Sequence, residues 1–225
     1  MTEPGAIVER LPHGPHGLSR EEVRASQQQR ILEAVMLAVG TRGYHEATVA
    51  HVTTAARVSR SAFYEQYSDK REAFLAAYTA WGRQFFGDLV RAGQQAGSLR
   101  EIIAASGEVL VQRARQEPEA SRAFILEVYA TGEPGLQARE EMLRLGQDLF
   151  DALAADLQAR DPAAVPPVAL AGLGVIGASF ELCAHVLRHP GDVMLDQVRE
   201  AIEDLWWVGL TGVSARSRRA GDSRS

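Results

Sequence analysis

The apolar residues of this 225-residue chain recur at three- and four-residue spacing through most of its length. This spacing places them on one face of an α-helix. A capping-box pair, Ser19 and Glu22, precedes the first such series, and Gly43 follows it. The pattern therefore predicts a first helix that begins near Ser19 and ends near Gly43. Its apolar positions are Ile31, Leu32, Val35, Met36 and Val39.

The same spacing predicts helices over most of the remaining chain, and glycine or proline stands at the breaks between them. The expected segments are 69–96, 98–116, 118–131, 134–160, 167–188 and 192–213. No segment alternates polar and apolar residues as a strand does, so the pattern predicts an all-α fold with about nine helices. We expect a flexible arm over 1–18, a small domain over 19–68, a larger helical domain over 69–213 and a flexible tail over 214–225.

Two short helices with a tight turn are predicted between Thr48 and Lys70, in the sequence TVAHVTTAARVSRSAFYEQYSDK. One apolar set follows Thr48, and a second set begins directly after the turn, with Ser59 as a good N-cap for the second helix. Such a helix-turn-helix presents the outer side of its second helix to the major groove of DNA. The residues expected at the tip or on that outer side are Arg60, Ser61, Ala62, Tyr64 and Glu65.

The side chains of this predicted reading helix have chemistry that suits DNA. Arg60 can make a two-pronged contact to guanine, and Glu65 could accept from cytosine, each contact being worth roughly 1–3 kcal/mol of discrimination. Tyr64 offers a hydroxyl one helical turn from Arg60. Lys70 falls in the first turn of the next helix, behind a possible N-cap at Ser68, where free backbone amides also attract phosphate.

The sequence VSRSAFYEQYSDKREAFL, residues 58–75, contains an aromatic pair, a spacer, a further aromatic and then lysine. This stretch resembles the DNA-binding domain of the TetR (tetracycline repressor) family. The resemblance implies that Arg60, Ser61 and Ala62 lie near base edges. It also implies phosphate contacts, by Thr48, Ser59, Tyr64 and Lys70.

One position departs from that family pattern. Family members usually carry glycine in the turn where this chain has Arg57. A residue other than glycine with positive φ costs on the order of 1 kcal/mol, which favours a slightly different turn here. Arg57 would offset this strain if it contacted phosphate, and a solvated turn residue is the equal alternative.

The net charge of −5 is unevenly distributed along the chain. Residues 1–80 hold 9 of the 24 basic residues and 9 of the 29 acidic residues, so the excess of acid lies in the remainder. A neutral DNA-binding part can still bind DNA if its cations converge, and salt should then weaken binding steeply.

The single cysteine, Cys183, excludes an internal disulfide, and the N-terminus lacks the pattern of a secretion signal. We therefore expect a cytoplasmic protein. Residues 162–180 carry no charge, but their prolines leave only about 14 residues of continuous helix, against roughly 20 needed to span a membrane. We expect a buried helix there and no membrane partner.

Aromatic residues between 81 and 189 fall on helices that must pack together, so they either line a pocket or fill a core. The TetR resemblance implies a pocket for a small-molecule effector, coupled to the DNA-reading parts through the long helix after Lys70. The candidates are Trp81, Phe85, Phe124, Glu127, Phe150, Phe180 and Glu181, with Cys183 and His185 as further polar residues.

The last two predicted helices carry small residues and large apolar ones, more than one partner helix needs. The resemblance implies that they pair with a second subunit, which would present two reading helices to a two-fold-related site. The interface candidates are Gly174, Gly177, Trp206 and Trp207.

Two patterns in the same region point to other ligands, and we expect neither ligand. Glu181 and His185 stand four residues apart, but two ligands do not make a metal site. GLGVIG, residues 172–177, matches a dinucleotide-binding pattern, yet prolines that open a helix precede it instead of a strand. The sequence therefore predicts no metal and no cofactor.

These features favour a homodimeric DNA-binding transcriptional regulator, a repressor that a small-molecule effector releases from a palindromic operator. An enzyme is disfavoured, because the chain has no Gly-x-Ser-x-Gly elbow, metal triad, phosphate loop or catalytic cysteine setting. The open alternative is an all-α ligand-binding or interaction protein without sequence-specific DNA binding.

Overall fold

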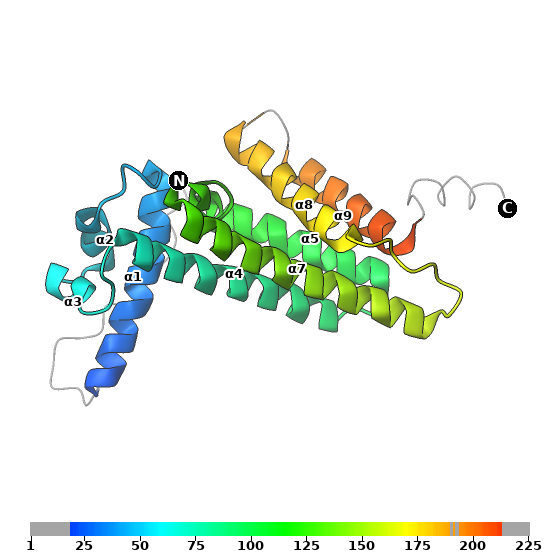
Figure 1. The fold of residues 1–225 in the computed structure, drawn as a ribbon, viewed down its shortest axis with the longest axis horizontal. Helices are drawn as coiled ribbons and strands as arrows, with labels where there is room; N and C mark the ends of the chain where they lie inside the picture. The colour runs from blue at the N-terminus through cyan, green and yellow to red at the C-terminus, as the bar shows by residue number, and fades with distance from the viewer. Residues whose placement is uncertain (1–18, 190, 192–193, 213–225) are drawn as a thin grey trace, which may run out of the picture.

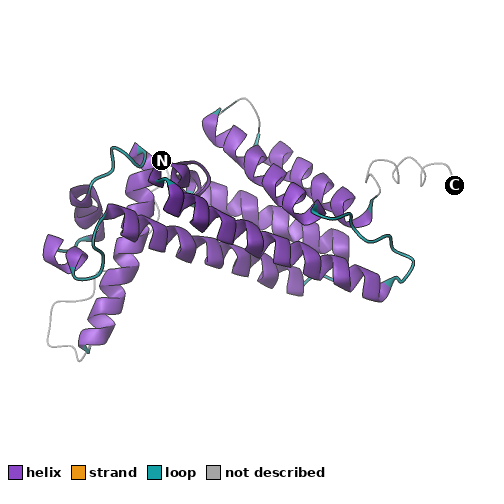
Figure 2. Ribbon diagram, viewed as in Figure 1, coloured by secondary structure: helices purple, strands orange, loops and turns teal. Residues whose placement is uncertain are grey.

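The computed structural model describes residues 19–189, 191 and 194–212, and every regular element in these ranges is helical (Figure 2). Nine α-helices occur in the described residues, which confirms the predicted all-α fold. The expected arm over 1–18 and the tail over 214–225 lie outside the described residues.

The N-terminal helices are close to their predicted positions. They are α1 (Arg20–Arg42), α2 (Val49–Ala56) and α3 (Arg60–Tyr64). Ser19 caps α1 in the predicted capping box with Glu22, and Gly43 ends the helix with φ 80°. Thr48 and Ser59 cap α2 and α3, because the hydroxyl of each accepts a backbone N–H of the first turn.

The later helices also match the pattern, with local differences. They are α4 (Lys70–Gln94), α5 (Leu99–Gln116), α6 (Pro118–Arg122), α7 (Glu133–Arg160), α8 (Ala171–Arg188) and α9 (Leu195–Thr211). The predicted helix 118–131 continues past α6 as a π-helical turn, η1 (Ala123–Glu127), and a 3₁₀ turn, η2 (Val128–Thr131). Helix α8 starts at 171 and not at 167, because Leu170 has the left-handed φ of 64°.

The helices form an elongated molecule with the helix-turn-helix at one end (Figure 1). Helix α4 leaves that end and runs along the molecule beside α5 and α7. Helices α8 and α9 pack on each other and lie over α7 and α5, respectively. The long helix α4 therefore connects the N-terminal helices to the body of the molecule.

One hydrophobic core runs from the N-terminal helices into this body. It joins buried residues of α1 and α3, such as Val35 and Phe63, to Phe74, Tyr78 and Phe124. A smaller cluster, formed by Ile103, Phe150, Val175 and Leu210, lies under α8 and α9. The boundary expected between residues 68 and 69 therefore does not divide the core.

Helix α1 also packs closely against α6, and Gly40 makes this approach possible. A β-carbon at position 40 would lie 1.9 Å from the carbonyl oxygen of Glu119, closer than any real contact. Because the obstacle is backbone, it cannot move aside as a flexible side chain could. The N-terminal helices are thus joined to the body through α6 as well as through α4.

Candidate DNA-binding face and effector cavity

The turn between α2 and α3 is held by backbone geometry and by α1. Arg57 has the left-handed φ 53° and ψ 46°, so the slightly different turn expected at the family's glycine position is not found. Arg57 N–H donates to the Thr54 carbonyl, and Val58 N–H donates to the Thr53 carbonyl at 3.1 Å, the pair of bonds that defines a Schellman motif. From α1, Arg30 Nη1 donates to the Ala56 carbonyl at 3.0 Å, which fixes the turn.

The outer side of α3 carries four of the five side chains predicted there. Arg60, Ser61, Tyr64 and Glu65 are exposed, and Tyr64 keeps half of its surface. No ion pair or hydrogen bond occupies the Arg60 guanidinium among the described residues, so it is available to a base edge. Ser61 Oγ lies 3.3 Å from Glu65 Oε1, so these two side chains share one hydrogen bond.

The expected exposure of Ala62 is wrong. Its exposed fraction is 9%, and its N–H donates to Ser59 Oγ at 3.0 Å. The first turn of α3 therefore turns the Ala62 methyl group toward the core beside Phe63, which is fully buried. Successive residues of a helix point in different directions, so Arg60, Ser61 and Ala62 cannot all lie on the same face.

The hydroxyl groups of the cap residues Thr48 and Ser59 can each still donate a hydrogen bond to a ligand. Each hydroxyl accepts one backbone N–H, from His51 and Ala62 respectively. A hydroxyl that accepts still has its own proton to donate. Both residues are exposed, so this geometry is compatible with the predicted phosphate contacts, which stay predictions.

Lys70 is engaged by the protein itself. Its Nζ donates to the carbonyls of Tyr44 and Ala47, the latter at 2.6 Å, and lies 3.5 Å from that of His45. The ammonium also lies 4.3 Å from the centre of the Tyr44 ring. The sequence did not indicate these contacts, and they leave Lys70 without a spare donor for phosphate. The cap of its helix is Asp69 and not Ser68, because Asp69 Oδ1 accepts Glu72 N–H at 2.8 Å.

A second contact joins this loop to the body of the molecule. Glu127, the last residue of the π-helical turn η1, accepts the Tyr44 N–H at 2.9 Å. The loop that precedes α2 is therefore held from one side by Lys70 and from the other by Glu127. This position corrects the expectation that Glu127 lines the effector pocket.

A cavity of about 120 Å³ lies in the body, between α4, α5, α8, α9 and η1. Its walls are almost entirely apolar. Four of the predicted aromatic residues line it, namely Trp81, Phe85, Phe124 and Phe180. Cys183 and Trp206 line it as well, together with aliphatic residues such as Ile102, Leu110 and Val198. Ile125, beside Phe124 in η1, also faces it.

Three predicted pocket residues lie elsewhere. Glu127 contacts the loop at Tyr44, as described above. Phe150 belongs to the smaller core cluster, where its ring packs on Trp206 at 5.8 Å. Glu181 is on the outside of α8 and pairs with Arg188 at 3.0 Å. His185, one turn further on the same helix, is exposed too. Charged residues of α8 thus point to the surface, while Phe180 and Cys183 point inward.

Arg113 is a charged residue of the cavity wall that no feature of the sequence indicated. Its guanidinium pairs with Asp88 and, at 2.8 Å, with Glu117, and it lies over the Trp81 ring. Burial opposes ionisation of Asp88, but bonds from Arg113 and Arg91 outweigh it and lower the Asp88 pKa. The charge of Arg113 is therefore already balanced, and the cavity favours an apolar ligand.

Cys183 is not a reactive thiol in this setting. Burial raises the pKa of its thiol to about 12, so the thiolate is scarce at neutral pH. The residue contributes a small apolar surface to the cavity.

The predicted dimer residues divide into two groups. Gly174 and Gly177 face outward, since a β-carbon at either position would meet nothing within 4 Å. Trp206 instead lines the cavity, and Trp207 packs with the Arg100 guanidinium 4.2 Å from its ring centre. The outward apolar residues are different ones, Leu173 on α8 and Val208 on α9, which are 39% and 43% exposed.

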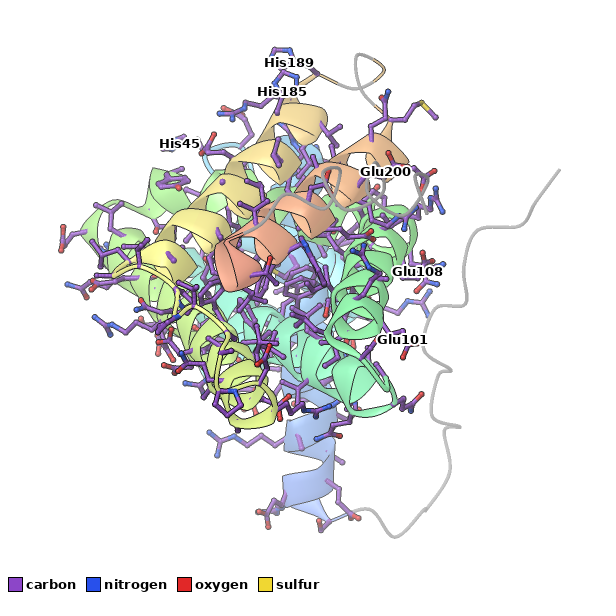
Figure 3. All side chains as sticks on the ribbon, turned by 90° about the vertical axis from the view of Figure 1, so that its right-hand side faces the viewer. His45, Glu101, Glu108, His185, His189 and Glu200 are labelled. Atoms are coloured by element: carbon purple, nitrogen blue, oxygen red, sulfur yellow. The ribbon has the colours of Figure 1, made fainter. Side chains whose placement is uncertain are left out.

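Possible metal ligands do not gather in the described residues, where no group of three or more His, Cys, Asp or Glu side chains is placed to hold an ion. Figure 3 shows His185 and His189 together at the outer end of α8, apart from the labelled glutamates of α5 and α9.

The GLGVIG segment, residues 172–177, lies inside helix α8 and does not follow a strand. Helix α8 is also long and apolar enough, by length and composition alone, to cross a membrane.

An exposed reading helix with a capped, locked turn, joined to a helical body with an apolar cavity, defines the fold of a helix-turn-helix transcriptional regulator. Residues 31–77 match the family model of the bacterial regulatory proteins of the tetR family. The match confirms the resemblance to the TetR family for this N-terminal segment.

Solved structures share the fold. The fatty acid degradation regulator FadR from Bacillus halodurans is 16% identical with a TM-score of 0.69, over 81% of this chain and 98% of its own. FadR from Bacillus subtilis, solved with stearoyl-CoA, is 14% identical with a TM-score of 0.70, over 82% and 98%. A TetR-like regulator from Rhodococcus sp. RHA1 is 20% identical with a TM-score of 0.62, over 91% and 100%. A comparison with the sequences of curated proteins gives no match.

Proposed function

We propose that this protein is a homodimeric cytoplasmic repressor that binds a palindromic operator and leaves it when a small apolar molecule occupies the cavity. The observation that carries the DNA-binding part is the reading helix α3, with Arg60 and Tyr64 exposed on a segment that matches the TetR family. Arg60 would read a base, while Thr48, Ser59 and Tyr64 would bind phosphates.

Lys70 has an indirect part in this proposal. It holds the loop over residues 44–47 by backbone carbonyls and so sets the position of Thr48 and α2. Removing it would weaken DNA binding through the shape of the domain and not through a lost phosphate contact.

The same loop offers a route from the cavity to the DNA-binding face. Phe124 and Ile125 face the cavity, and Glu127 at the end of the same turn bonds Tyr44. A ligand that displaces Phe124 would move η1, a π-helical turn, and with it the hold on the loop. Such a ligand lowers operator affinity only if it binds the displaced state better.

The chemical class of the effector is inferred from the residues that line the cavity and from a protein of similar fold. The cavity walls are apolar, and their one guanidinium is balanced by two carboxylates. The similar FadR of Bacillus subtilis was solved with stearoyl-CoA. These facts support an effector with a long apolar part.

We place the dimer contact on the outer faces of α8 and α9, at Leu173, Gly174, Gly177 and Val208. The glycines would allow close approach of a second helix, and the exposed apolar residues would be covered. Val208→Glu should lower the mass in sedimentation, whereas Leu136→Glu, which changes an exposed apolar residue on α7, should leave it unchanged. A dimer that survives Val208→Glu would place the interface elsewhere.

Repression is tested by transcription in vitro from a promoter that carries a sequence bound by this protein. Wild-type protein should lower the amount of transcript, while Arg60→Ala should not at the same concentration. An increase in transcript would show an activator. No effect and no bound sequence would favour the alternative, an all-α ligand-binding or interaction protein.

A further inference from the structure

Arg139, on α7, has an unusual environment for a charged side chain. Its guanidinium carbon lies 4.5 Å from the ring centre of Phe180 and 5.2 Å from that of Tyr129. Nη1 is buried and has no hydrogen-bond partner in the described part of the chain. No carboxylate of the described residues forms an ion pair with it, whereas Arg113 in the same region has two. Contact with aromatic faces leaves the N–H donors of Arg139 unused.

Tyr78, on α4, is a second unpartnered donor beside Arg139. It is fully buried, its ring stacks on Phe124 at 4.6 Å, and its hydroxyl lies near the Arg139 guanidinium without forming a well-aligned hydrogen bond to it or to any other described residue. Burial raises the pKa of this hydroxyl well above its ordinary value, although Arg139 close by opposes the shift. Tyr78 is therefore a neutral phenol with a proton to donate.

These two donors lie behind one wall of the cavity. Phe124 and Phe180 line the cavity, and the same rings pack on Tyr78 and Arg139 respectively. On the other side, Arg139 is half-buried and Tyr129 is 45% exposed, so the pair is close to the surface. An amphiphilic molecule could place its polar end at the donors and pass its apolar part by Phe180 into the cavity.

The unmet donors define the chemistry of that polar end. A buried polar group without a partner costs about 1–3 kcal/mol, and more when it is charged, so this arrangement favours an acceptor that carries negative charge. One guanidinium supplies a single positive charge and a planar pair of donors, which matches one carboxylate. A phosphate monoester would leave excess negative charge in a half-buried place.

We propose that Arg139 and Tyr78 bind the carboxylate of an effector whose apolar chain occupies the cavity. This inference rests on the proposed role of the cavity as the effector site. Arg139 contributes the charge and the paired donors, and Tyr78 contributes one further hydrogen bond. A bound carboxylate would accept hydrogen bonds from both unpartnered donors at once. The site would therefore bind an acid more tightly than a neutral molecule of the same length.

The test compares dodecanoate with 1-dodecanol, which share a chain length and differ in charge. Binding is followed by tryptophan fluorescence, because Trp81 and Trp206 line the cavity. Wild-type protein should bind the acid at least about tenfold more tightly than the alcohol, the ratio for a charge-assisted bond of about 1.4 kcal/mol. Arg139→Gln should abolish that preference and leave the affinity for the alcohol unchanged.

Two further variants separate recognition from folding. Tyr78→Phe keeps the stacked ring and should reduce the preference for the acid without changing alcohol binding. Arg144→Gln changes an exposed arginine of the same helix, paired with Glu140, and should behave as wild type. Equal binding of acid and alcohol by the wild type would overturn this inference but leave the proposed role of the cavity as the effector site intact. Binding of neither would overturn the cavity itself, and an equal loss of both in Arg139→Gln and Tyr78→Phe would show a structural role only.

Discussion

Replacing Lys70 by alanine separates a structural role from a phosphate contact. The change removes two bonds from the ammonium to the carbonyls of Tyr44 and Ala47, and its contact with the Tyr44 ring. A hydrogen bond to a charged group contributes about 1.5–3 kcal/mol, and the partial exposure of Lys70 reduces each of the two bonds to about 1 kcal/mol. We expect Lys70→Ala to lower the free energy of unfolding by about 2 kcal/mol and Tm by about 4–8 °C.

The assay joins thermal unfolding with DNA binding at several salt concentrations. A residue that neutralises one phosphate contributes about 0.9 to the slope of log affinity against log salt. If Lys70 only holds the loop, Lys70→Ala lowers Tm and affinity but leaves the slope unchanged. Arg71→Ala, an exposed neighbour, is the control for a change of charge without loss of these bonds. An unchanged Tm with a slope reduced by about one would refute the reasoning and restore the phosphate contact.

Three other positions give independent predictions. Arg57→Gly should raise the free energy of unfolding by about 1 kcal/mol, because glycine adopts φ 53° without strain; lower stability in urea unfolding would contradict this. Gly40→Ala should lower it by about 1–3 kcal/mol through the clash with Glu119, whereas Gly87→Ala, where a β-carbon would meet only the flexible end of Arg91, should not; equal effects would refute the packing argument. Alkylation of Cys183 at pH 8 should be much slower in folded than in urea-unfolded protein, since burial raises its pKa to about 12; equal rates would show that the thiol is accessible.

The sequence predicted the helices and most of their ends well, because those signals are local. Ser19, Thr48 and Ser59 cap helices where their hydroxyls lie next to free amides, and helical spacing placed the apolar face of α1 correctly. The slightly different turn expected at Arg57 is wrong, because Arg57 adopts the left-handed conformation itself.

Side-chain partners across the fold could not be predicted in this way. Lys70 looked like a phosphate ligand from its place in the first turn of α4, but its partners are carbonyls some 25 positions earlier in the chain. Glu127 is 83 positions from Tyr44, and no local pattern indicates such a bond. The charge and position of a residue in the sequence indicate the type of contact that it can make. Which residue it contacts depends on how the helices pack in the folded protein.

The cavity shows the same division between type and position. The aromatic residues assigned to the interior lie there except for Tyr129, which is 45% exposed. Spacing does not distinguish a residue that lines a cavity from one that fills a core. Phe124 lines the cavity and Phe150 does not, although each is only 1% exposed. Arg139 gave no signal in the sequence, because its unmet donors appear only when its neighbours on α4, η2 and α8 are known.

Sequence-specific DNA binding is the central claim, and selection from a random duplex pool at moderate salt tests it most directly. Wild-type protein should enrich a two-fold-symmetric motif. Arg60→Ala should lose one base preference, worth roughly 1–3 kcal/mol, and Tyr64→Ala should bind the same motif more weakly. Failure of the wild type to enrich any sequence, at a concentration where the protein is folded and dimeric, would contradict the account.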